Sequence, residues 1–282
     1  MLRKCIRVVS GAGFAVLLCV GIVRAQTTLG TAQAFAVLGG STVTNTGLTT
    51  VTGNLGVSPG AAVVGFGGPP NGTVIGVIHA GNAVALQAQT DLTTYYNLLE
   101  NAPCTQILTG LDLGGMILTS GVYCFATSAQ LTGILTLNAQ GNAGATFVFR
   151  IGSTLTTASG SSVVLINGGN PCGVAWQIGS SATLGTTTSF IGNLIALSSI
   201  TLNTGANIIG RALARNGAVT LDTNNISFAP CSAGGGPPPV PGPPPVATLS
   251  TWAVVALIGL LALAGFATLR RRQSLTGQHP GL

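Results

Sequence analysis

Residues 178–225 read IGSSATLGTTTSFIGNLIALSSITLNTGANIIGRALARNGAVTLDTNN and contain one short phrase three times. The phrase is apolar–Thr–Leu, at 182–184, 200–202 and 219–221, and its leucines stand 18 and 19 residues apart. A repeat of this length, built on strand-forming residues, is typical of a solenoid with one coil per repeat. Because side chains alternate across a strand, the sequence predicts an inward ladder of leucines and an outward ladder of threonines.

The repeat also defines two columns of threonine. The first stands at the centre of each predicted strand, on the outward parity: Thr183, Thr201 and Thr220. The second stands three residues further on, on the inward parity: Thr186, Thr204 and Thr223. The second column reaches the surface only if the chain turns a corner there, which Gly205 and Asn224 indicate. Both columns are candidates for the functional surface.

The composition describes a polar but almost uncharged surface on a chain long enough for one or two domains. Charged residues make up 5% of the 282 residues and apolar residues 46%, whereas an ordinary soluble protein is roughly 25% charged. The net charge of +6 comes from the two ends of the chain. The interior holds three arginines and four acidic residues: Arg150, Arg211, Arg215, Asp91, Glu100, Asp112 and Asp222. The basic patch that nucleic-acid binding needs is therefore missing.

The few charged residues also argue against an enzyme. A solenoid hydrolase or lyase acting on polysaccharides needs clustered carboxylates or basic groups in a cleft. A Ser–His–Asp arrangement would have to use His79, and no nucleophile motif is present. We therefore expect no catalytic residues, no cofactor and no small-molecule substrate.

The first 25 residues have the pattern of a secretory signal peptide. Basic residues up to Arg7 precede an apolar run at 8–23, and Val-Arg-Ala stands before Gln26. We expect cleavage after Ala25 and an exported mature domain over residues 26–231. A retained membrane anchor is the alternative interpretation.

Four cysteines remain after the signal peptide, and an even number in an exported chain indicates two disulfides. The pairs Cys104–Cys124 and Cys172–Cys231 are the most economical in sequence order. A metal site is the rival interpretation, but the spacings are wide and only His79 is near, so no metal is expected.

One segment predicts a helix among the short strands. Over residues 79–100 an apolar stripe recurs at helical spacing: Val84, Ala88, Leu92, Tyr95 and Leu99. Pro103 lies just beyond, as expected of a stop. After it, aromatic strands follow one another, with Tyr123, Phe149 and Trp176 at 26 and 27 residues, which indicates successive coils of one face.

The C-terminal part has a different composition. Residues 232–247 form a Gly/Pro-rich linker, and 252–269 is a run of 18 residues without a charge, followed by Arg270, Arg271 and Arg272. At about 1.5 Å per residue such a run just crosses a membrane, and the arginines place the C-terminus in the cytoplasm. A buried core helix is the alternative.

The tail at 248–282, with the residues just before it, resembles bacterial protein-sorting signals of the Ile-Pro-Thr-Leu type. Those signals combine a short motif and a nearby Trp with a hydrophobic helix and an arginine cluster. The corresponding residues here are Val246, Ala247, Thr248, Leu249 and Trp252, of which the first two depart from Ile-Pro. The resemblance implies a Gram-negative bacterium, an exosortase-type processing enzyme as a partner, and a protein that is first anchored in the inner membrane and then released or attached at the cell surface.

Residues 29–227 resemble the microbial ice-binding family. The matching stretches are FAVLGGSTVTNTG at 35–47, GNLGVSPG at 53–60 and residues 188–223, which include GRALARNGAVTL at 210–221. The resemblance implies a discontinuous right-handed β-solenoid of triangular cross-section with a long helix packed alongside, and an ice crystal surface as the partner. Some members carry a Thr–(Ala or Gly)–any–(Thr or Asn) motif on the ice-contacting face. It is matched here by Thr46 with Thr49, and by Thr204 with Asn207.

Two functions fit these observations. A flat threonine grid presents hydroxyls that bond water beside methyl groups that do not, and stiff β-branched side chains keep it ordered, which favours ice binding. An adhesin or structural module of the cell envelope, binding glycans or cells through the same polar face, is the alternative.

Overall fold

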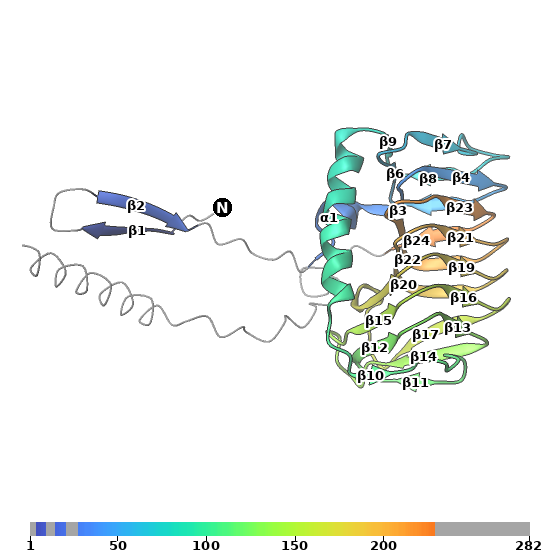
Figure 1. Cartoon of the computed structure of the whole chain (residues 1–282). Coiled ribbons are helices and arrows are strands. Elements are labelled where there is room, and N and C mark those ends of the chain that lie inside the picture. The colour runs from blue at the N-terminus through green and yellow to red at the C-terminus, as the bar shows by residue number, and fades with distance from the viewer. Residues whose placement is uncertain (1–3, 10–14, 21–27, 229–282) are drawn as a thin grey trace, which may run out of the picture. The chain divides into compact units, whose positions relative to one another are not determined.

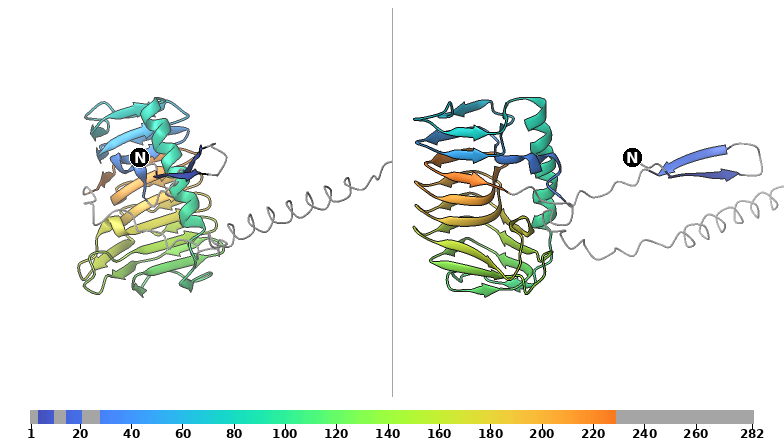
Figure 2. Two further views of the ribbon diagram at one scale, coloured as in Figure 1. Left: turned by 90° about the vertical axis from the view of Figure 1, so that its left-hand side faces the viewer. Right: turned by 180° about the vertical axis from the view of Figure 1, so that it is seen from behind.

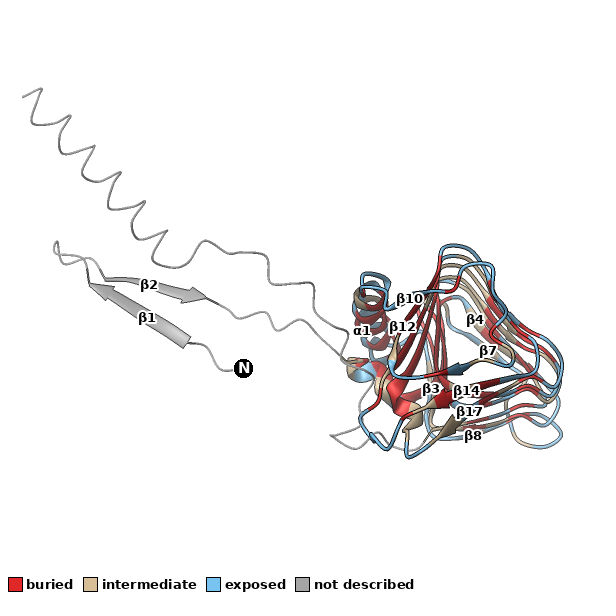
Figure 3. Ribbon diagram, turned by 90° about the horizontal axis from the view of Figure 1, so that it is seen from below, coloured by how far each residue is buried: buried red, intermediate tan, exposed pale blue. Residues whose placement is uncertain are grey.

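The computed structural model describes residues 4–9, 15–20 and 28–228 (Figure 1). Residues 28–228 wind into stacked coils with three flat sides, and one long helix lies along one of them. The expected mostly-β solenoid with a helix alongside is confirmed, and the view along its axis shows the triangular section (Figure 3). Near the N-terminus β1 (Lys4–Val9) pairs antiparallel with β2 (Ala15–Val20).

One side of the solenoid is a parallel sheet of seven strands. In spatial order these are β13 (Ala129–Leu131), β16 (Leu155–Thr157), β19 (Ala182–Leu184), β21 (Ile200–Leu202), β23 (Val219–Asp222), β4 (Thr42–Thr46) and β7 (Ala62–Val64). The three repeats of the apolar–Thr–Leu phrase occupy β19, β21 and β23 in register. Leu184, Leu202 and Leu221 are all buried, so the inward leucine ladder is confirmed.

The other two sides share a fifteen-stranded sheet that folds around a corner. The long strands β20 (Ser189–Ala196) and β22 (Asn207–Ala214) run across both sides and bend at Gly192 and Gly210, with φ of +113° and +148°. A Cβ on Gly210 would lie 2.0 Å from the carbonyl oxygen of Gly192. A side chain at this corner would therefore force the two coils apart, which explains why glycine recurs there.

These two sides differ in what covers them. The side under the helix consists of β10 (Gln106–Ile107), β12 (Gly121–Phe125), β15 (Phe147–Ile151), β18 (Val174–Ile178), the second halves of β20 and β22, β3 (Phe35–Gly39), β6 (Asn54–Val57) and β9 (Ile78–Ala80). The open side consists of β11 (Ile117–Leu118), β14 (Ile134–Asn138), β17 (Ser162–Ile166), the first halves of β20 and β22, β24 (Asn225–Ser227), β5 (Thr50–Thr52) and β8 (Thr73–Ile75).

The coils are not stacked in chain order. The coils from β3 to β9 form one end of the stack, and the chain then follows the helix to the opposite end, where β10 begins (Figures 1 and 2). From there the coils return until β22, β23 and β24 pair with β3, β4 and β5. The discontinuous order that the family resemblance implied is therefore confirmed, and the first and last coils of the domain meet inside the stack.

Aromatic rings from three neighbouring strands, β12, β15 and β18, stack in the core. Tyr123 stacks on Phe149 with ring centroids 5.5 Å apart, and Phe149 stacks on Trp176 at 3.8 Å. The strands that carry them pair in the predicted register. Both polar groups of this stack have partners: the indole nitrogen of Trp176 donates to the carbonyl oxygen of Ile191, 3.0 Å away, and the hydroxyl of Tyr123 donates to the carbonyl oxygen of Thr119.

Helix α1 (Ala83–Glu100) starts later than the predicted residue 79. His79 belongs to β9, and the side chain of Asn82 caps the helix by accepting a hydrogen bond from the amide of Ala85 at 3.0 Å. The stripe from Ala88 to Leu99 is buried as predicted, but Val84 is 49% exposed because it lies in the first turn, off the packed face. The short 3-10 helix η1 (Gly30–Ala34) packs against α1, where the Asp91 carboxylate accepts from the amide and hydroxyl of Thr31 at 2.7 Å each.

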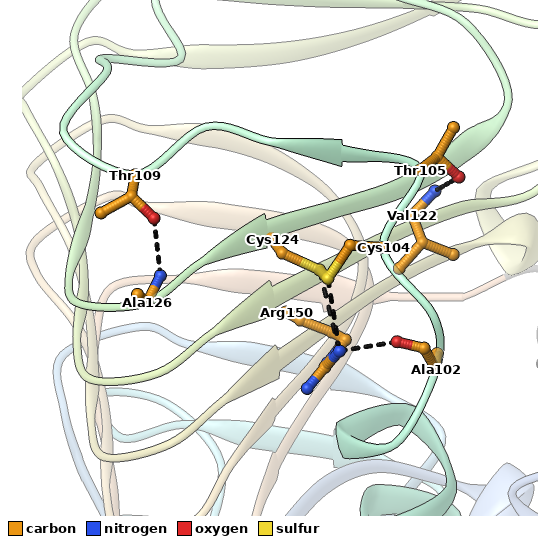
Figure 4. Close-up of a disulfide and its surroundings, with 8 residues drawn as sticks. All are labelled: Ala102, Cys104, Thr105, Thr109, Val122, Cys124, Ala126 and Arg150. Atoms are coloured by element: carbon orange, nitrogen blue, oxygen red, sulfur yellow. Dashed lines mark hydrogen bonds between the residues drawn. A yellow bond between two sulfur atoms is a disulfide. The ribbon is translucent and has the colours of Figure 1, made fainter.

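The predicted Cys104–Cys124 disulfide is present, with 5.8 Å between the Cα atoms (Figure 4). It fastens the segment after α1 to β12, and Arg150 donates to the carbonyl oxygen of Ala102 beside it at 2.6 Å. Cys172, in the 3-10 turn η2 (Pro171–Gly173), is also disulfide-bonded. Cys231, the predicted partner, lies outside the described residues.

The linker at 232–247 and the tail at 248–282 likewise lie outside the described part, and so do the sorting motif from Val246 to Trp252 and the span at 252–269. Within the described ranges no helix is long and apolar enough to cross a membrane.

Candidate functional site

The outer surface of the seven-stranded sheet, here called the Thr face, carries one column of outward side chains along its centre. In register along the seven strands, these are Gln130, Thr156, Thr183, Thr201, Thr220, Thr44 and Val64, and Asp112 forms an isolated bridge with Gln130 at one end of the column. The five threonines occupy five consecutive strands. Their neighbours along each strand point into the core, so the outward parity of Thr183, Thr201 and Thr220 is confirmed.

The hydroxyls of this column are available to water. Among the described residues, the hydroxyls of Thr156, Thr183 and Thr201 have no hydrogen-bond partner. Thr44 and Thr220 approach each other only to 3.5 Å between their oxygen atoms. Each hydroxyl can therefore donate to and accept from ordered water, while the neighbouring methyl cannot.

A second column of small side chains flanks the first, two residues earlier along the chain. It consists of Ser128, Thr154, Ser181, Ser199, Ala218, Thr42 and Ala62. Several hydroxyls in it accept a hydrogen bond from a backbone N–H of the next coil. The hydroxyl of Ser181 accepts from the N–H of Ser199 at 3.3 Å, and the hydroxyl of Ser199 accepts from the N–H of Ala218 at 3.2 Å. The flanking column is thus held by the backbone, which keeps the face flat and stiff.

The alternative threonine column does turn a corner and is exposed, as its inward parity required. At this corner, however, the hydroxyls are engaged: Thr186 donates to Ser159 at 2.7 Å, and Thr204 and Thr223 donate to the carboxylate of Asp222. The hydrogen bond from Thr204 holds the pKa of Asp222 below its ordinary value. The corner therefore presents a negative charge, and the threonine hydroxyls around it already donate hydrogen bonds within the protein.

The two matches to the Thr–(Ala or Gly)–any–(Thr or Asn) motif lie at the same corner, where Thr49 is buried and the exposed Thr204 and Asn207 already have hydrogen-bond partners. Thr46 is exposed, but Thr49 is 1% exposed, and its hydroxyl accepts from the amide of Asn224 at 3.0 Å. Thr49 therefore cannot contact a surface, because it closes the inside of the turn. Asn207 is exposed, yet its amide group donates to Gly205 and accepts from Asn225, at 2.9 and 2.7 Å.

The uncovered side of the fifteen-stranded sheet, here called the second face, is the other open surface. One of its columns runs through Ser162, Ser189, Asn207, Asn225, Thr50 and Thr73. Its neighbouring column is mixed, with Ile209 at 47% exposure beside Ser227 and Thr52, and with Ile75 at the end. Bulky aliphatic side chains stand in the same column as small polar ones, so the second face is less regular than the Thr face.

Comparison with known proteins identifies the family to which this architecture belongs. The chain matches the sequence model of the ice-binding-like family over residues 37–227. The chain belongs to this family.

Relatives of the ice-binding-like family resemble the chain over most of the described domain. An ice-binding protein from Nostoc sp. (strain HG1) is 60% identical over 202 residues, which are 71% of this chain and 74% of the relative. An ice-binding protein from Flammulina populicola is 32% identical over 225 residues, 73% of this chain and 90% of the relative. The crystal structure of an ice binding protein from an Antarctic biological consortium has a TM-score of 0.69 at 45% identity, covering 76% of this chain and 96% of that one.

In this ice-binding-like domain the charged side chains lie outside the central run of threonines, although Asp222 borders the Thr face and Asp112 is paired with Gln130 at the end of the central column. Arg211 and Arg215 pack near the helix, and Asp112 lies at the end of the stack that contains β10 and β11. A cavity of about 450 Å³ lies between Glu100, Arg150 and the Cys104–Cys124 disulfide, on the helix side. Within the described part of the chain no group of His, Cys, Asp and Glu could hold a metal ion.

Sequence reasoning missed two members of the central column of this ice-binding-like domain, Thr44 and Thr156. Both stand in an apolar–Thr phrase, as Val43-Thr44 and Leu155-Thr156, but neither is followed by leucine at the next position. A search for apolar–Thr alone would have found them, at the cost of matching many ordinary strands. The serines of the flanking column do not form a repeat that could be recognised in the sequence by itself. They can be found only by counting two residues back from each threonine of the central column.

Proposed function

We propose that this protein binds ice through the Thr face and thereby inhibits ice growth or recrystallisation. The observation that carries the proposal is the run of five threonines in register, Thr156 to Thr44, on five consecutive strands. With strands about 4.8 Å apart, this column is roughly 19 Å long.

The geometry suits a surface that orders water. Along each strand the flanking and central side chains are about 6.6–6.8 Å apart, and across coils about 4.8 Å, so the two columns form a rectangular grid. Threonine is β-branched and nearly fixed at χ1, so its hydroxyl and methyl stay at set positions. Long charged side chains would disturb the ordered water, and neither column contains one.

Relatives that are named ice-binding proteins support this proposal, since their similarity extends over the whole solenoid. The favoured ice contacts are Thr44, Thr156, Thr183, Thr201 and Thr220. Thr46, Thr186, Thr204, Thr223 and Asn207 line the edge of this face, where their bonded hydroxyl and amide groups bind water less freely.

An adhesin or structural module remains the alternative function, and the second face is the observation that favours it. Its exposed Ile75, Val164 and Ile209, between small polar residues, form a surface that a glycan or a protein of the cell envelope could contact.

We further propose that the protein is exported. Residues 1–25 act as the signal peptide, the span at 252–269 anchors the chain transiently in the inner membrane, and an exosortase-type enzyme acts near Thr248 and Leu249. The support is the sequence pattern alone: a charged start, an apolar run and the arginine cluster at 270–272.

The test uses the purified mature domain, residues 26–231, with its folded state verified by circular dichroism and a cooperative thermal transition. We expect it to shape growing ice crystals, lower their growth temperature or stop recrystallisation. A folded protein that fails in all three assays would contradict ice binding and favour the adhesin.

A further inference from the structure

The cavity of about 450 Å³ on the helix side is built from three neighbouring strands and the end of the helix. Cys124 of β12, Arg150 of β15 and Gln177 of β18 stand in register and line it. Glu100, the last residue of α1, and the segment at 104–109 complete the lining. The cavity therefore lies apart from both the Thr face and the second face, and its size is that of a small-molecule site.

Arg150 is a half-buried cation whose guanidinium group is only partly used by the fold. Its Nη1 donates to the carbonyl oxygen of Ala102 at 2.6 Å and lies 3.4 and 3.8 Å from the sulfur atoms of Cys104 and Cys124 (Figure 4). Among the described residues, neither the buried Nε nor Nη2 has a hydrogen-bond partner, and no carboxylate forms an ion pair with this side chain. Because a charge removed from water is costly unless it is paired, Arg150 lacks a counter-ion that an anionic ligand would supply.

Glu100 restricts the kind of anion that fits. It is exposed at the C-terminal end of α1, where the helix dipole disfavours a negative charge, so its position does not serve the stability of the helix. It lines the same cavity as Arg150, yet the two form no ion pair within the described part of the chain. A doubly charged anion such as phosphate would be repelled by Glu100. A single carboxylate that carries hydroxyl groups suits both residues, because hydroxyls can donate to Glu100.

Three further side chains of the lining have the polarity that a hydroxylated ligand needs. The hydroxyl of Thr109 accepts from the N–H of Ala126 at 2.8 Å, which leaves its own hydrogen free to donate (Figure 4). Gln177 brings an amide group that is 3% exposed. Ile107 is 72% exposed and supplies an apolar surface beside these groups. A sugar ring matches this mixture, since it carries hydroxyls around its edge and C–H groups on its faces.

We propose that this cavity binds a sugar acid, with Arg150 holding the carboxylate and with Glu100 and Thr109 bonding the hydroxyls. The proposal does not rest on ice binding, and it concerns a different surface from the second face that favours the adhesin. A free sugar acid and one unit of an acidic polysaccharide present the same chemical group to the cavity, and the experiment below separates these two sources.

The test is equilibrium dialysis of the full-length protein, in detergent micelles, against radiolabelled galacturonate. We expect one saturable site per chain with a Kd on the order of 1 mM, the affinity that ordinary ligand efficiency gives a molecule of this size. Neutral galactose should not compete. Competition by polygalacturonate identifies a unit of an acidic polysaccharide as the ligand, whereas competition by galacturonate alone identifies a free sugar acid.

Two variants locate the site, each with a matched control and with folding verified by circular dichroism. Arg150→Met should weaken galacturonate binding by about tenfold or more, whereas Arg215→Met, which changes another half-buried arginine of the helix side, should not.

Because Arg150 also bonds Ala102, a second variant leaves the fold untouched. Ile107→Glu adds a negative charge at an exposed position and should weaken binding about fivefold at low salt, while Ile107→Gln should not. The proposal is overturned if no saturable binding occurs well above the expected Kd, if galactose competes as well as galacturonate, or if folded Arg150→Met and Ile107→Glu both bind like the unchanged protein.

Discussion

Arg211 donates two hydrogen bonds, from Nε and Nη2, to the carbonyl oxygen of Gln33, a residue 178 positions earlier in the chain, at 3.2 and 2.9 Å. Its Nη1 donates to the side chain of Asn193 at 2.8 Å, and its plane faces the ring of Phe228. One buried guanidinium therefore connects the first segment of the domain, the neighbouring coil and the residue that follows the last strand, β24. Burial lowers the pKa of Arg211 to about 10, which leaves it charged at neutral pH.

Replacing Arg211 should loosen the place where the two ends of the domain meet. Arg211→Met removes the donors that bond the carbonyl oxygen of Gln33 and the side-chain oxygen of Asn193. We therefore expect the free energy of unfolding to fall by about 3 kcal/mol. Thermal or urea unfolding measures the loss. Arg215→Met is the matched control, since Arg215 is half-buried over the ring of Tyr96 and should cost less than about 1 kcal/mol. Equal losses would show that the junction is not held by Arg211.

A bulky side chain on the Thr face should abolish ice activity without unfolding the domain. Thr201 is half-buried with its hydroxyl directed outward, so Thr201→Tyr interrupts the grid while changing stability by no more than about 0.5 kcal/mol. Asn225→Tyr makes the same kind of change on the second face and should leave activity near that of the unchanged protein. The opposite pattern in a recrystallisation assay would move the ice contact to the second face.

The leucine next to that threonine should show the reverse behaviour. Leu202 is 1% exposed, and Leu202→Ala removes a rung of the inward ladder, which we expect to cost about 2–5 kcal/mol of unfolding free energy. Ice activity per folded molecule should persist at 4 °C, where enough of the protein remains folded. A stable Leu202→Ala variant would mean that the core collapses around the lost side chain.

The disulfide should contribute to stability and not to ice binding. Cys104 and Cys124 are 20 residues apart, and closing a loop of that size is worth about 3 kcal/mol in the chain-entropy account. The double variant Cys104→Ser with Cys124→Ser should therefore melt at lower temperature and keep its ice activity when folded, because the disulfide lies on the helix side. Loss of activity in a folded double variant would place a functional role at this end of the stack.

Ice activity should not depend on pH between 5 and 9, because the two carboxyl groups beside the Thr face, Asp112 and Asp222, have lowered pKa values and stay charged throughout this range. Stability should behave differently in acid. Burial alone would raise the pKa of Asp112, but hydrogen bonds from Gly114 and Thr132 outweigh it and hold that pKa below the ordinary value. The pKa of Asp222 is lowered by Thr204 in the same sense.

A carboxyl whose pKa is lowered by folding stabilises the native state above the pKa of the unfolded chain, and this contribution is lost as the pH falls through the native pKa. We therefore expect stability to be flat above about pH 5 and to decline below about pH 4. Asp112→Asn should lower stability at neutral pH and make the decline shallower. Unfolding curves measured from pH 2 to 7 test both statements.

Much of the fold was predictable because the repeat is local. The leucine ladder, the outward threonines, the aromatic trio and the Cys104–Cys124 pair all follow from spacings within about two coils. Thr44 belongs to the same column as Thr220 although the two are 176 positions apart in the sequence. No sequence period connects them, because the helix and the coils from β10 onward lie between them in the chain. The family resemblance supplied the discontinuity that periodicity could not.

The candidate site was predictable only in part, for a physical reason visible at the corner. Thr204 and Thr49 both match the expected motif, yet a turn exposes one side chain and buries the other, and this depends on left-handed backbone at positions such as Thr223 (φ +55°). The bond from Thr204 to Asp222 joins neighbouring coils, so it could not be read from either coil alone. The helix start shifted because β9 pairs with β6 and withdraws His79 from the helix.

The length of helix α1 is linked to the area of the Thr face. Its 18 residues carry the chain about 27 Å along the stack before the returning coils begin. One more coil would lengthen the stack by about 4.8 Å, the rise of a little more than three helical residues and so slightly less than one turn. An insertion that enlarges the Thr face by one rung must therefore bring about one helical turn with it, which leaves the buried stripe of α1 facing the sheet. The contact area of this architecture can grow only in whole steps, each made of one coil and one turn.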